Sequence, residues 1–300
     1  MKIYIFGSNG FLGKNILKNI KHPTILCDNG FLDSPIIPGT LDLDITKDIN
    51  SLDSLFKNES DDFVVINLAA IHSIPYCNKH PKDAYFTNVY GNQLLYESSS
   101  RNGCKKYIFA SSGAVYKPQT KPHTEFDFLE SSDIYSATKI IAENNLEISS
   151  QHSNTPVIAL RLFNMVGPHD LTPHLLPELA DQLLSSSNIL NLGDLSTIRN
   201  YIHVYDCVTA ILLLLEYQSN TNFLVCNVCS DDGFTGFEMV ETAQNILGTS
   251  KQIRLDQNRL RKSDRPVQVG SNSLLKSIIN WEPKYSFYDA IRDYLNWRRS

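Results

Sequence analysis

Short runs of apolar residues recur along the first 160 residues, with helical segments between them. The runs are residues 2–6, 24–27, 41–45, 63–70, 107–110 and 156–162. Helices are predicted at residues 15–20, 51–57 and 81–100, and after a cap at Ser132 or Asp133. A run that is apolar at nearly every position suits a parallel strand that helices cover on both faces. This alternation predicts an α/β fold with a doubly wound parallel sheet.

The pattern changes after Asn164. Shorter mixed elements follow, and three prolines crowd their beginning: Pro168, Pro173 and Pro177. We therefore expect two domains. The first comprises residues 1–163, to which residues 204–229 return, and the second is a smaller mixed α/β domain of residues 164–203 and 230–300.

Gly7, Gly10 and Gly13 stand between the first predicted strand and the following helix. Glycines at such a turn permit close approach of a pyrophosphate, which rests on the helix N-terminus. Asp28 ends the second strand, where a carboxylate accepts from both adenosine ribose hydroxyls and repels a 2′-phosphate. Asp28 also fits a plain turn residue before Gly30. The pattern predicts a Rossmann-type site that favours NAD over NADP.

Tyr135 and Lys139 are four residues apart, so on a helix both side chains project from the same face. A phenol has a pKa of about 10, and a neighbouring ammonium and hydrogen bonds to the phenolate lower it. Reaching a pKa of about 7 takes about 4 kcal/mol. A lysine, a nicotinamide cation and a hydroxyl donor can supply this jointly in a dry site. By itself the spacing also fits two solvated helix residues.

Composition narrows the class of protein. Hydrophobic residues make up 42% of the chain and charged residues 20%, as in ordinary soluble globular proteins. The net charge of −5 argues against nucleic acid as the main partner. No apolar run approaches the ~20 residues of a membrane span, and the short start before Gly7 is no signal sequence. We expect a cytoplasmic protein without a membrane partner.

The six cysteines are scattered, which favours reduced thiols over a disulfide framework. Cys226 and Cys229 have the spacing of zinc ligands, but no second Cys or His pair follows at a suitable distance. They also lie in an apolar, strand-like run. We expect no metal site.

Further short motifs follow one another along the whole chain. They include Asp28-Asn29, Asp44-Ile45, Leu68-Ala69-Ala70, Asn88-Val89, Ser111-Ser112, Val115-Tyr116, Arg161-Leu162-Phe163-Asn164, Gly167-Pro168, the run from Arg199 to Asp206, Asn227-Val228 and Trp281-Glu282-Pro283. With the glycine turn and Tyr135/Lys139, this series resembles the extended short-chain dehydrogenases/reductases. The resemblance is to their NAD-dependent nucleotide-sugar epimerase/dehydratase family, of the UDP-glucose 4-epimerase-like type.

The resemblance implies roles for individual residues. Tyr135 would be the acid/base, Lys139 would hold the nicotinamide ribose and lower the pKa of Tyr135, and Ser112 would hydrogen-bond the reacting sugar oxygen. The implied NAD site consists of Gly7, Gly10, Phe11, Leu12, Gly13, Asp28, Asn29, Asp44, Ile45, Leu68, Ala69, Ala70, Asn88, Tyr135, Lys139 and Phe163.

The implied substrate is a nucleotide-diphosphate sugar. Ser112 in the first domain would bond its sugar, and Asn164, Arg199 and Arg261 in the second domain would hold its diphosphate. Guanidinium groups suit phosphate oxygens, although each arginine also fits a surface salt bridge. Arg259 and Arg265 lie close to Arg261 and compete for its role. The family usually forms homodimers through helices that begin near Pro81 and Asp133, so a homodimer is implied here.

The chain departs from the family pattern at several positions. Lys117 replaces a glycine, Asn92 a threonine and Asn200 an aspartate. The change at Asn200 removes a charge and makes the identity of the sugar less certain. Gly113 and Ala114 stand where family 4,6-dehydratases carry acids that eliminate water, so dehydration is disfavoured.

The hypothesis is an NAD-dependent nucleotide-diphosphate-sugar 4-epimerase that oxidises the sugar transiently at C4. The nearest alternative is a nucleotide-4-keto-sugar reductase that consumes NADPH, against which Asp28 argues. A 4,6-dehydratase is a further alternative. A catalytically inactive dinucleotide sensor would belong to another class, but it would be expected to lose Tyr135, Lys139 or Ser112.

Overall fold

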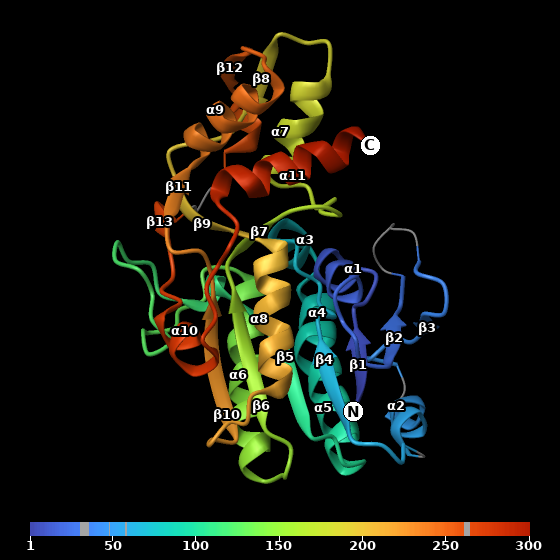
Figure 1. Cartoon of the computed structure of the whole chain (residues 1–300). Helices are drawn as coiled ribbons and strands as arrows, with labels where there is room; N and C mark the ends of the chain where they lie inside the picture. Colours follow the sequence, from blue (N-terminus) through green and yellow to red (C-terminus); the bar gives the residue numbers. More distant parts are fainter. Residues whose placement is uncertain (31–35, 48, 58, 261–264) are drawn as a thin grey trace. The chain divides into compact units, whose positions relative to one another are not determined.

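The computed structural model describes residues 1–30, 36–47, 49–57, 59–260 and 265–300 (Figure 1). Its chain forms two compact units. Unit 1 comprises Met1–Lys117, Glu125–Leu162 and Ile211–Asn227, and unit 2 comprises Pro118–Thr124, Phe163–Ala210 and Val228–Ser300.

A seven-stranded sheet forms the centre of unit 1, in the order β10-β6-β5-β4-β1-β2-β3. Its strands are β1 (Lys2–Phe6), β2 (Thr24–Asp28), β3 (Leu41–Asp42), β4 (Phe63–Asn67), β5 (Lys106–Ser112), β6 (Val157–Leu162) and β10 (Phe223–Val228). From β3 to β6 every neighbouring pair is parallel. The strand order reverses between β1 and β4, so the carboxyl ends of these two strands mark the topological switch point. The predicted doubly wound α/β fold is confirmed.

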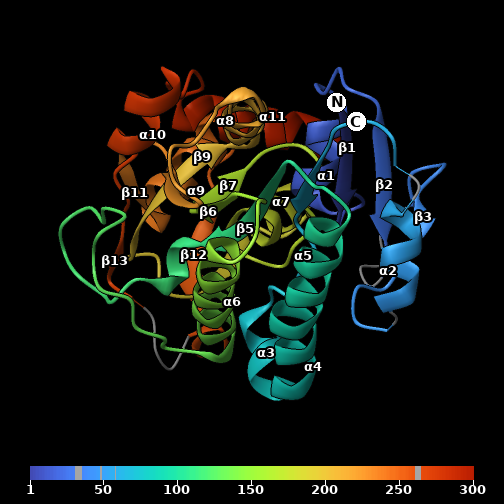
Figure 2. The ribbon, with the colours of Figure 1, turned by 90° about the horizontal axis from the view of Figure 1, so that it is seen from below.

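Helices cover both faces of this sheet. Figure 2 shows α5 (Asn92–Arg101) and α6 (Ile134–Gln151) on one face and α1 (Phe11–Leu17) on the other. α2 (Ile49–Phe56) packs against α5 on the same face. All five residues of β4 are buried between these layers, which agrees with its uninterrupted apolar run.

Three predicted boundaries were wrong. The helix expected over 81–100 is divided into α4 (Pro81–Tyr85), the π-helix η1 (Phe86–Gly91) and α5. α3 (Ile74–Lys79) precedes them. β3 ends at Asp42 rather than 45, because hydrogen bonds from Thr46 to Asp44 turn the chain. α1 begins at Phe11 rather than 15, because Gly10 already serves as its N-cap.

Unit 2 is built around β9 (Ile198–His203), which pairs with β11 (Gly233–Thr235), β13 (Val267–Gln268) and β7 (Asn164–Val166). β8 (Ile189–Leu192) and β12 (Gln252–Leu255) form a separate two-stranded sheet. The longer helices of this unit are α7 (Leu175–Leu184), α9 (Gly236–Leu247) and α11 (Phe287–Arg299), whose apolar sides share one core. α10 (Ser273–Ile279) and the short η3 (Gln257–Arg259) complete it, and α8 (Val204–Glu216) runs from this unit into unit 1.

Within the ranges that the structure describes, no helix combines the length and apolar character that crossing a membrane requires.

Candidate functional site

The glycine turn after β1 lies against the chain that leaves β4. Gly7 has a φ of +78°, and a Cβ on it would lie 2.8 Å from the backbone nitrogen of Ala69. A Cβ on Gly13 would lie 2.5 Å from the carbonyl oxygen of Ser8. Neither position can carry a side chain without moving the backbone. The resulting close-packed cradle sits at the switch point, where a doubly wound sheet binds its ligand, and it fits a dinucleotide.

Asp28 stands beside this turn at the end of β2. Its Oδ2 accepts a hydrogen bond from the backbone of Asn9 at 2.9 Å, and its Oδ1 accepts one from Gly30 at 2.9 Å. Asn29 follows it and is exposed. Asp28 thus shapes the turn, as its alternative role required, and its carboxylate is held at the edge of the sheet where a ribose contact was predicted.

The other predicted cofactor residues at this edge of the sheet differ in whether they are exposed or already bonded within the protein. Ala69 donates to Asn67 Oδ1 at 3.0 Å and borders Gly7, while Leu68 and Ala70 are partly exposed. Asp44 already accepts hydrogen bonds from Thr46 and an ion pair from Lys47. Burial would raise the pKa of Asp44, but these partners together lower it. Ile45, Leu12 and Phe11 belong to the same edge, and Ile45 is buried in the core.

Asn88 has a structural task in addition to its predicted place at the cofactor. Its Oδ1 accepts from the backbone of Ile71 at 2.8 Å, and its Nδ2 donates to Ile71 O at 2.9 Å and to Thr138 Oγ1 at 3.0 Å. Thr138 Oγ1 in turn donates to Tyr135 O at 2.7 Å. The buried Asn88 therefore ties the segment after β4 to the helix that carries Tyr135.

Tyr135, Lys139 and Ser112 meet where β5 ends and α6 begins. Asp133 caps α6 by accepting from the backbone of Ser136 at 2.8 Å, and Ser136 returns a bond to the cap. Lys139 Nζ donates to Ala110 O at 2.7 Å and lies 5.9 Å from the centre of the Tyr135 ring. The Ser112 hydroxyl lies close enough to the Tyr135 phenol to lower its pKa. The structure brings together the three residues that were predicted to do the chemistry.

The electrostatics of the protein by itself hold Tyr135 in its neutral form. Burial raises the pKa of Tyr135 to about 12, against the effect of the Ser112 hydrogen bond. Burial lowers the pKa of Lys139 to about 8, against the effect of the Glu143 carboxylate. A phenolate near neutral pH therefore needs a further positive charge beside Tyr135, which an oxidised nicotinamide would bring.

Two predicted substrate residues of unit 2, Asn164 and Arg199, lie on one sheet. Asn164 on β7 pairs in register with Tyr201 on β9, and Arg199 stands two residues before Tyr201. Since side chains alternate along a strand, Asn164 and Arg199 project from the same face. Phe163 is buried and packs so closely on Gly270 that a Cβ there would lie 2.4 Å from its ring. Arg261 lies outside the described residues.

Two of the three departures from the family pattern have local explanations. Asn92 Oδ1 accepts from both Asn67 Nδ2 at 2.8 Å and Tyr107 OH at 2.9 Å in a buried network. Asn200 is buried and its amide nitrogen donates to two backbone carbonyls, those of Ser230 and Asp232, each at 2.9 Å. An ionised aspartate could donate to neither.

Several residues near Tyr135 and Lys139 were not predicted. His72, two residues after Ala70, is exposed and lies near enough to Lys139 for the lysine charge to lower its pKa. Cys77 on α3 is buried beside Tyr135. Glu143 lies one helical turn beyond Lys139 and pairs with Arg161. Only Glu143 had a sequence signal, its spacing of four from Lys139.

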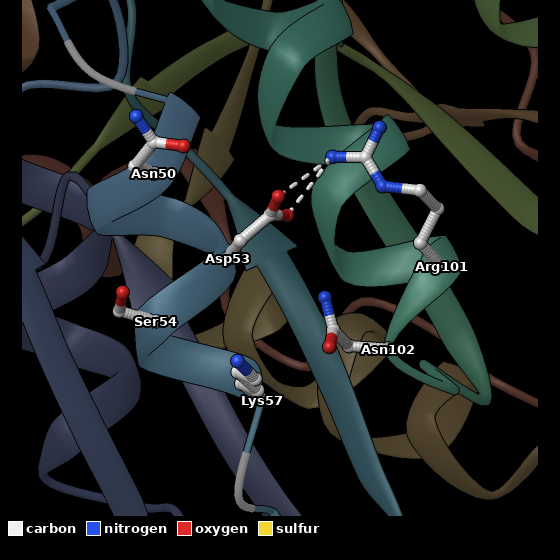
Figure 3. Close-up of a pocket in the computed structure, with 6 residues that line it drawn as sticks. All are labelled: Asn50, Asp53, Ser54, Lys57, Arg101 and Asn102. Atoms are coloured by element: carbon white, nitrogen blue, oxygen red, sulfur yellow. Dashed lines mark hydrogen bonds and ion pairs between the residues drawn. The ribbon is translucent and has the colours of Figure 1, made fainter.

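A hollow of about 380 Å³ opens elsewhere on unit 1, between α2 and α5 (Figure 3). Its lining is polar: Asn50, Asp53, Ser54, Lys57, Arg101 and Asn102. Asp53 points toward Arg101 and accepts from its Nη2 at 2.9 and 3.0 Å. The C-terminal ends of these helices lead into the amino ends of β4 and β5, which is the opposite edge from the glycine turn.

In the described part of the chain, no three His, Cys, Asp or Glu side chains gather as metal ligands.

The chain is similar over its whole length to sugar-nucleotide enzymes. UDP-glucose 4-epimerase of Pisum sativum is 26% identical over 338 residues, covering 100% of this chain and 96% of that protein. UDP-glucose 4-epimerase 3 of Oryza sativa subsp. japonica is 28% identical over 257 residues, covering 78% and 68%. The solved structure of UDP-glucose 4-epimerase from Thermotoga maritima with UDP-glucose matches with a TM-score of 0.91 and 25% identity, covering 100% and 99%.

The Thermus thermophilus UDP-glucose 4-epimerase, solved in complex with NAD, shares the fold with a TM-score of 0.87, at 23% identity over 100% of this chain and 99% of that one. The model of the NAD dependent epimerase/dehydratase family matches residues 3–229, which include the glycine turn, Tyr135 and Lys139. The match covers well over half of the chain. The chain therefore belongs to the NAD dependent epimerase/dehydratase family, whose cofactor is NAD.

Proposed function

We propose that this protein is an NAD-dependent nucleotide-diphosphate-sugar 4-epimerase. The observation that carries the proposal is the meeting of Tyr135, Lys139 and Ser112 at the carboxyl end of β5, in a chain of this family. When bound, NAD would accept the hydride from sugar C4 and return it to the opposite face. Side chains of the protein would bind the cofactor and the substrate and transfer the proton.

The cradle at the switch point would hold NAD. Gly7 and Gly13 leave space for the pyrophosphate, and Asp28 would accept from the adenosine ribose at the end of β2. Lys139 has one hydrogen-bond acceptor among the described residues, Ala110 O, so its ammonium has further N–H groups to offer to the nicotinamide ribose. The residues present therefore fit this cofactor.

Tyr135 would move the proton of the sugar 4-hydroxyl. The phenolate, stabilised by the charges of Lys139 and the oxidised cofactor, would take the proton as the 4-keto sugar forms. Tyr135 would return the proton after the keto sugar has rotated to present its other face. Ser112 would hold the reacting oxygen. Proton transfer by a positioned side chain contributes about 10²–10⁴-fold, and alignment of C4 would supply the rest.

The nucleotide-sugar would be held by Asn164 and Arg199, which share one face of the unit 2 sheet. The relatives at 26% and 28% identity act on UDP-glucose, so a UDP-sugar is the first substrate to test. Ser112 accepts from the backbone of Ala114 at 3.1 Å, and no carboxylate stands at positions 113 and 114 to drive elimination. Reversible epimerisation therefore fits this site better than dehydration.

The decisive experiment compares Tyr135→Phe with Tyr288→Phe, a matched change on an exposed ring. Each protein is incubated with a panel of UDP-, GDP-, dTDP- and CDP-sugars, and product stereochemistry is measured. Tyr135→Phe should lose turnover while it keeps NAD, and Tyr288→Phe should keep both. Near-full activity of Tyr135→Phe would exclude the acid/base role, and net consumption of NADPH would favour a ketoreductase instead.

A homodimer is proposed on the exposed apolar side chains of contacting helices. Phe86 and Tyr90 stack at 5.0 Å on η1, and Ile141 and Ile148 are exposed on α6. Leu95 on the neighbouring α5 takes no part in this surface, because it is fully buried in the core. Light scattering of the purified protein measures whether the mass is that of two chains.

A further inference from the structure

One face of α6 meets three consecutive residues of β5. Tyr135, Lys139 and Glu143 follow one another at intervals of four, so they form a line along the helix. Lys139 donates to Ala110 O, Tyr135 lies near Ser112, and Glu143 accepts from Ser111 Oγ between them. The proposed chemistry uses the first two of these connections. It gives no task to the third.

The third connection is a buried ion pair. Glu143 is 2% exposed and Arg161, on β6, is 4% exposed. Arg161 Nη2 donates to Glu143 Oε2 at 2.7 Å, and Nε lies 3.1 and 3.2 Å from the two carboxylate oxygens. Arg161 is also held from its other side, since Nη1 donates to Tyr116 OH at 2.9 Å and to Glu125 O at 3.1 Å.

The register of the sheet places this pair beside the site. Ser111 on β5 is the partner of Arg161 on β6, and both meet the same carboxylate. A buried ion pair contributes little net stability compared with an apolar replacement, because desolvation offsets the attraction. Its presence one turn beyond Lys139 calls for another explanation.

We propose that Glu143 is a positioning residue for the proposed epimerase site: through Ser111 and Arg161 it fixes the Tyr135–Lys139 face of α6 on β5, and from one helical turn away its carboxylate provides a counter-charge to Lys139. The proposal rests on the function proposed for Tyr135 and Lys139. It adds that the charge of Lys139 depends on Glu143, a side chain that touches neither substrate nor cofactor.

The groups around Lys139 show why a carboxylate is needed there. Tyr135 and Glu143 face it from α6, Cys77 from α3, and His72 from the segment after β4. Burial raises the pKa of the Cys77 thiol to about 11, so Cys77 is neutral at physiological pH. Burial lowers the pKa of Lys139 to about 8, and Glu143 is the first of the groups that act against this fall.

The charge is tested with Glu143→Gln, which keeps the shape of the side chain and one of its two acceptor oxygens. Glu147→Gln, an exposed position one turn farther along α6, is the matched control. The titration of Lys139 is followed by NMR of ¹³C-labelled lysine in the protein as purified, with Lys139→Arg to assign the signal. Glu143→Gln should lower the titration midpoint by about one pH unit, and Glu147→Gln should leave it unchanged. Equal midpoints in folded Glu143→Gln and wild type would overturn the proposal.

The anchoring is tested with Ser111→Ala, which removes the bond to β5 and leaves both charges. Its kcat should fall about tenfold with KM and the Lys139 midpoint unchanged, because alignment is disturbed but charge is not. An unchanged kcat would refute the anchoring, even if Glu143→Gln fails to fold. Should wild type turn over no nucleotide sugar at all, the proposed function fails, and the Lys139 midpoints still decide the part played by Glu143.

Discussion

Two buried lysines are attached to the two ends of strand β5, and they differ in how their ammonium groups are used. Lys106, the first residue of β5, donates to the carbonyls of Leu214 at 2.8 Å, Leu215 at 2.5 Å and Tyr217 at 2.6 Å. These carbonyls close the C-terminal end of α8. Lys139 reaches the other end of the strand and donates to Ala110 O at 2.7 Å.

Burial lowers the pKa of both lysines to about 8. A perturbed pKa therefore does not distinguish a structural lysine from a functional one. The acceptors do, because the backbone takes all three N–H groups of Lys106 and one N–H group of Lys139 within the described residues. The end of the strand matters too, since ligands of doubly wound sheets bind at the carboxyl edge.

Lys139→Met should have the strongest effect on turnover. We expect kcat to fall by about 10²-fold or more, because Tyr135 loses the charge that favours its phenolate. The free energy of unfolding should stay equal or rise, since an apolar side chain replaces a buried charge. Turnover of a UDP-sugar and urea unfolding measure the two quantities. Retained activity would show that Lys139 is as structural as Lys106.

The converse change, Lys106→Met, should act on stability instead. It leaves the carbonyls at the end of α8 without their donor, so the free energy of unfolding should fall by about 2 kcal/mol. The folded fraction should keep its kcat. Lys105→Met is the matched control, because its ion pair with Asp62 is exposed and should contribute under about 1 kcal/mol. A loss of kcat in folded Lys106→Met would place this lysine in the reaction.

The sequence could predict one of these lysines and not the other. The spacing of Tyr135 and Lys139 is local, so helix geometry alone puts them on one face, and the glycine turn is local in the same way. The partners of Lys106 lie 108 to 111 residues away, and nothing near Lys106 signals them. Asn88 and Ile71, 17 residues apart, likewise meet only because η1 packs beside the segment after β4.

Stability as a function of pH compares the lysines directly. Below about pH 8 each lysine is charged in both the folded and the unfolded chain. Between about pH 8 and about pH 10.4, the unfolded chain keeps a proton on the lysine that the folded chain has lost. Each lysine thus adds up to about 1.4 kcal/mol of stability per pH unit in this window. The stability of wild type minus that of either Met variant should therefore increase from about pH 8 to about pH 10. Urea unfolding across this range measures it, and a flat difference would mean that the lysine is not perturbed.

The smallest effect is expected at Lys117, which supplies a surface baseline shortly after the same strand. Its ammonium lies 3.6 Å from Glu130, and its side chain is 61% exposed. Lys117→Ala should change the free energy of unfolding by less than about 0.5 kcal/mol and leave kcat unchanged. The same assays measure both, and a large loss of kcat would show that this departure from the family glycine bears on the site. Since Lys117 and Lys139 carry the same group, the contrast between them isolates burial at the carboxyl edge as the feature that makes a lysine functional.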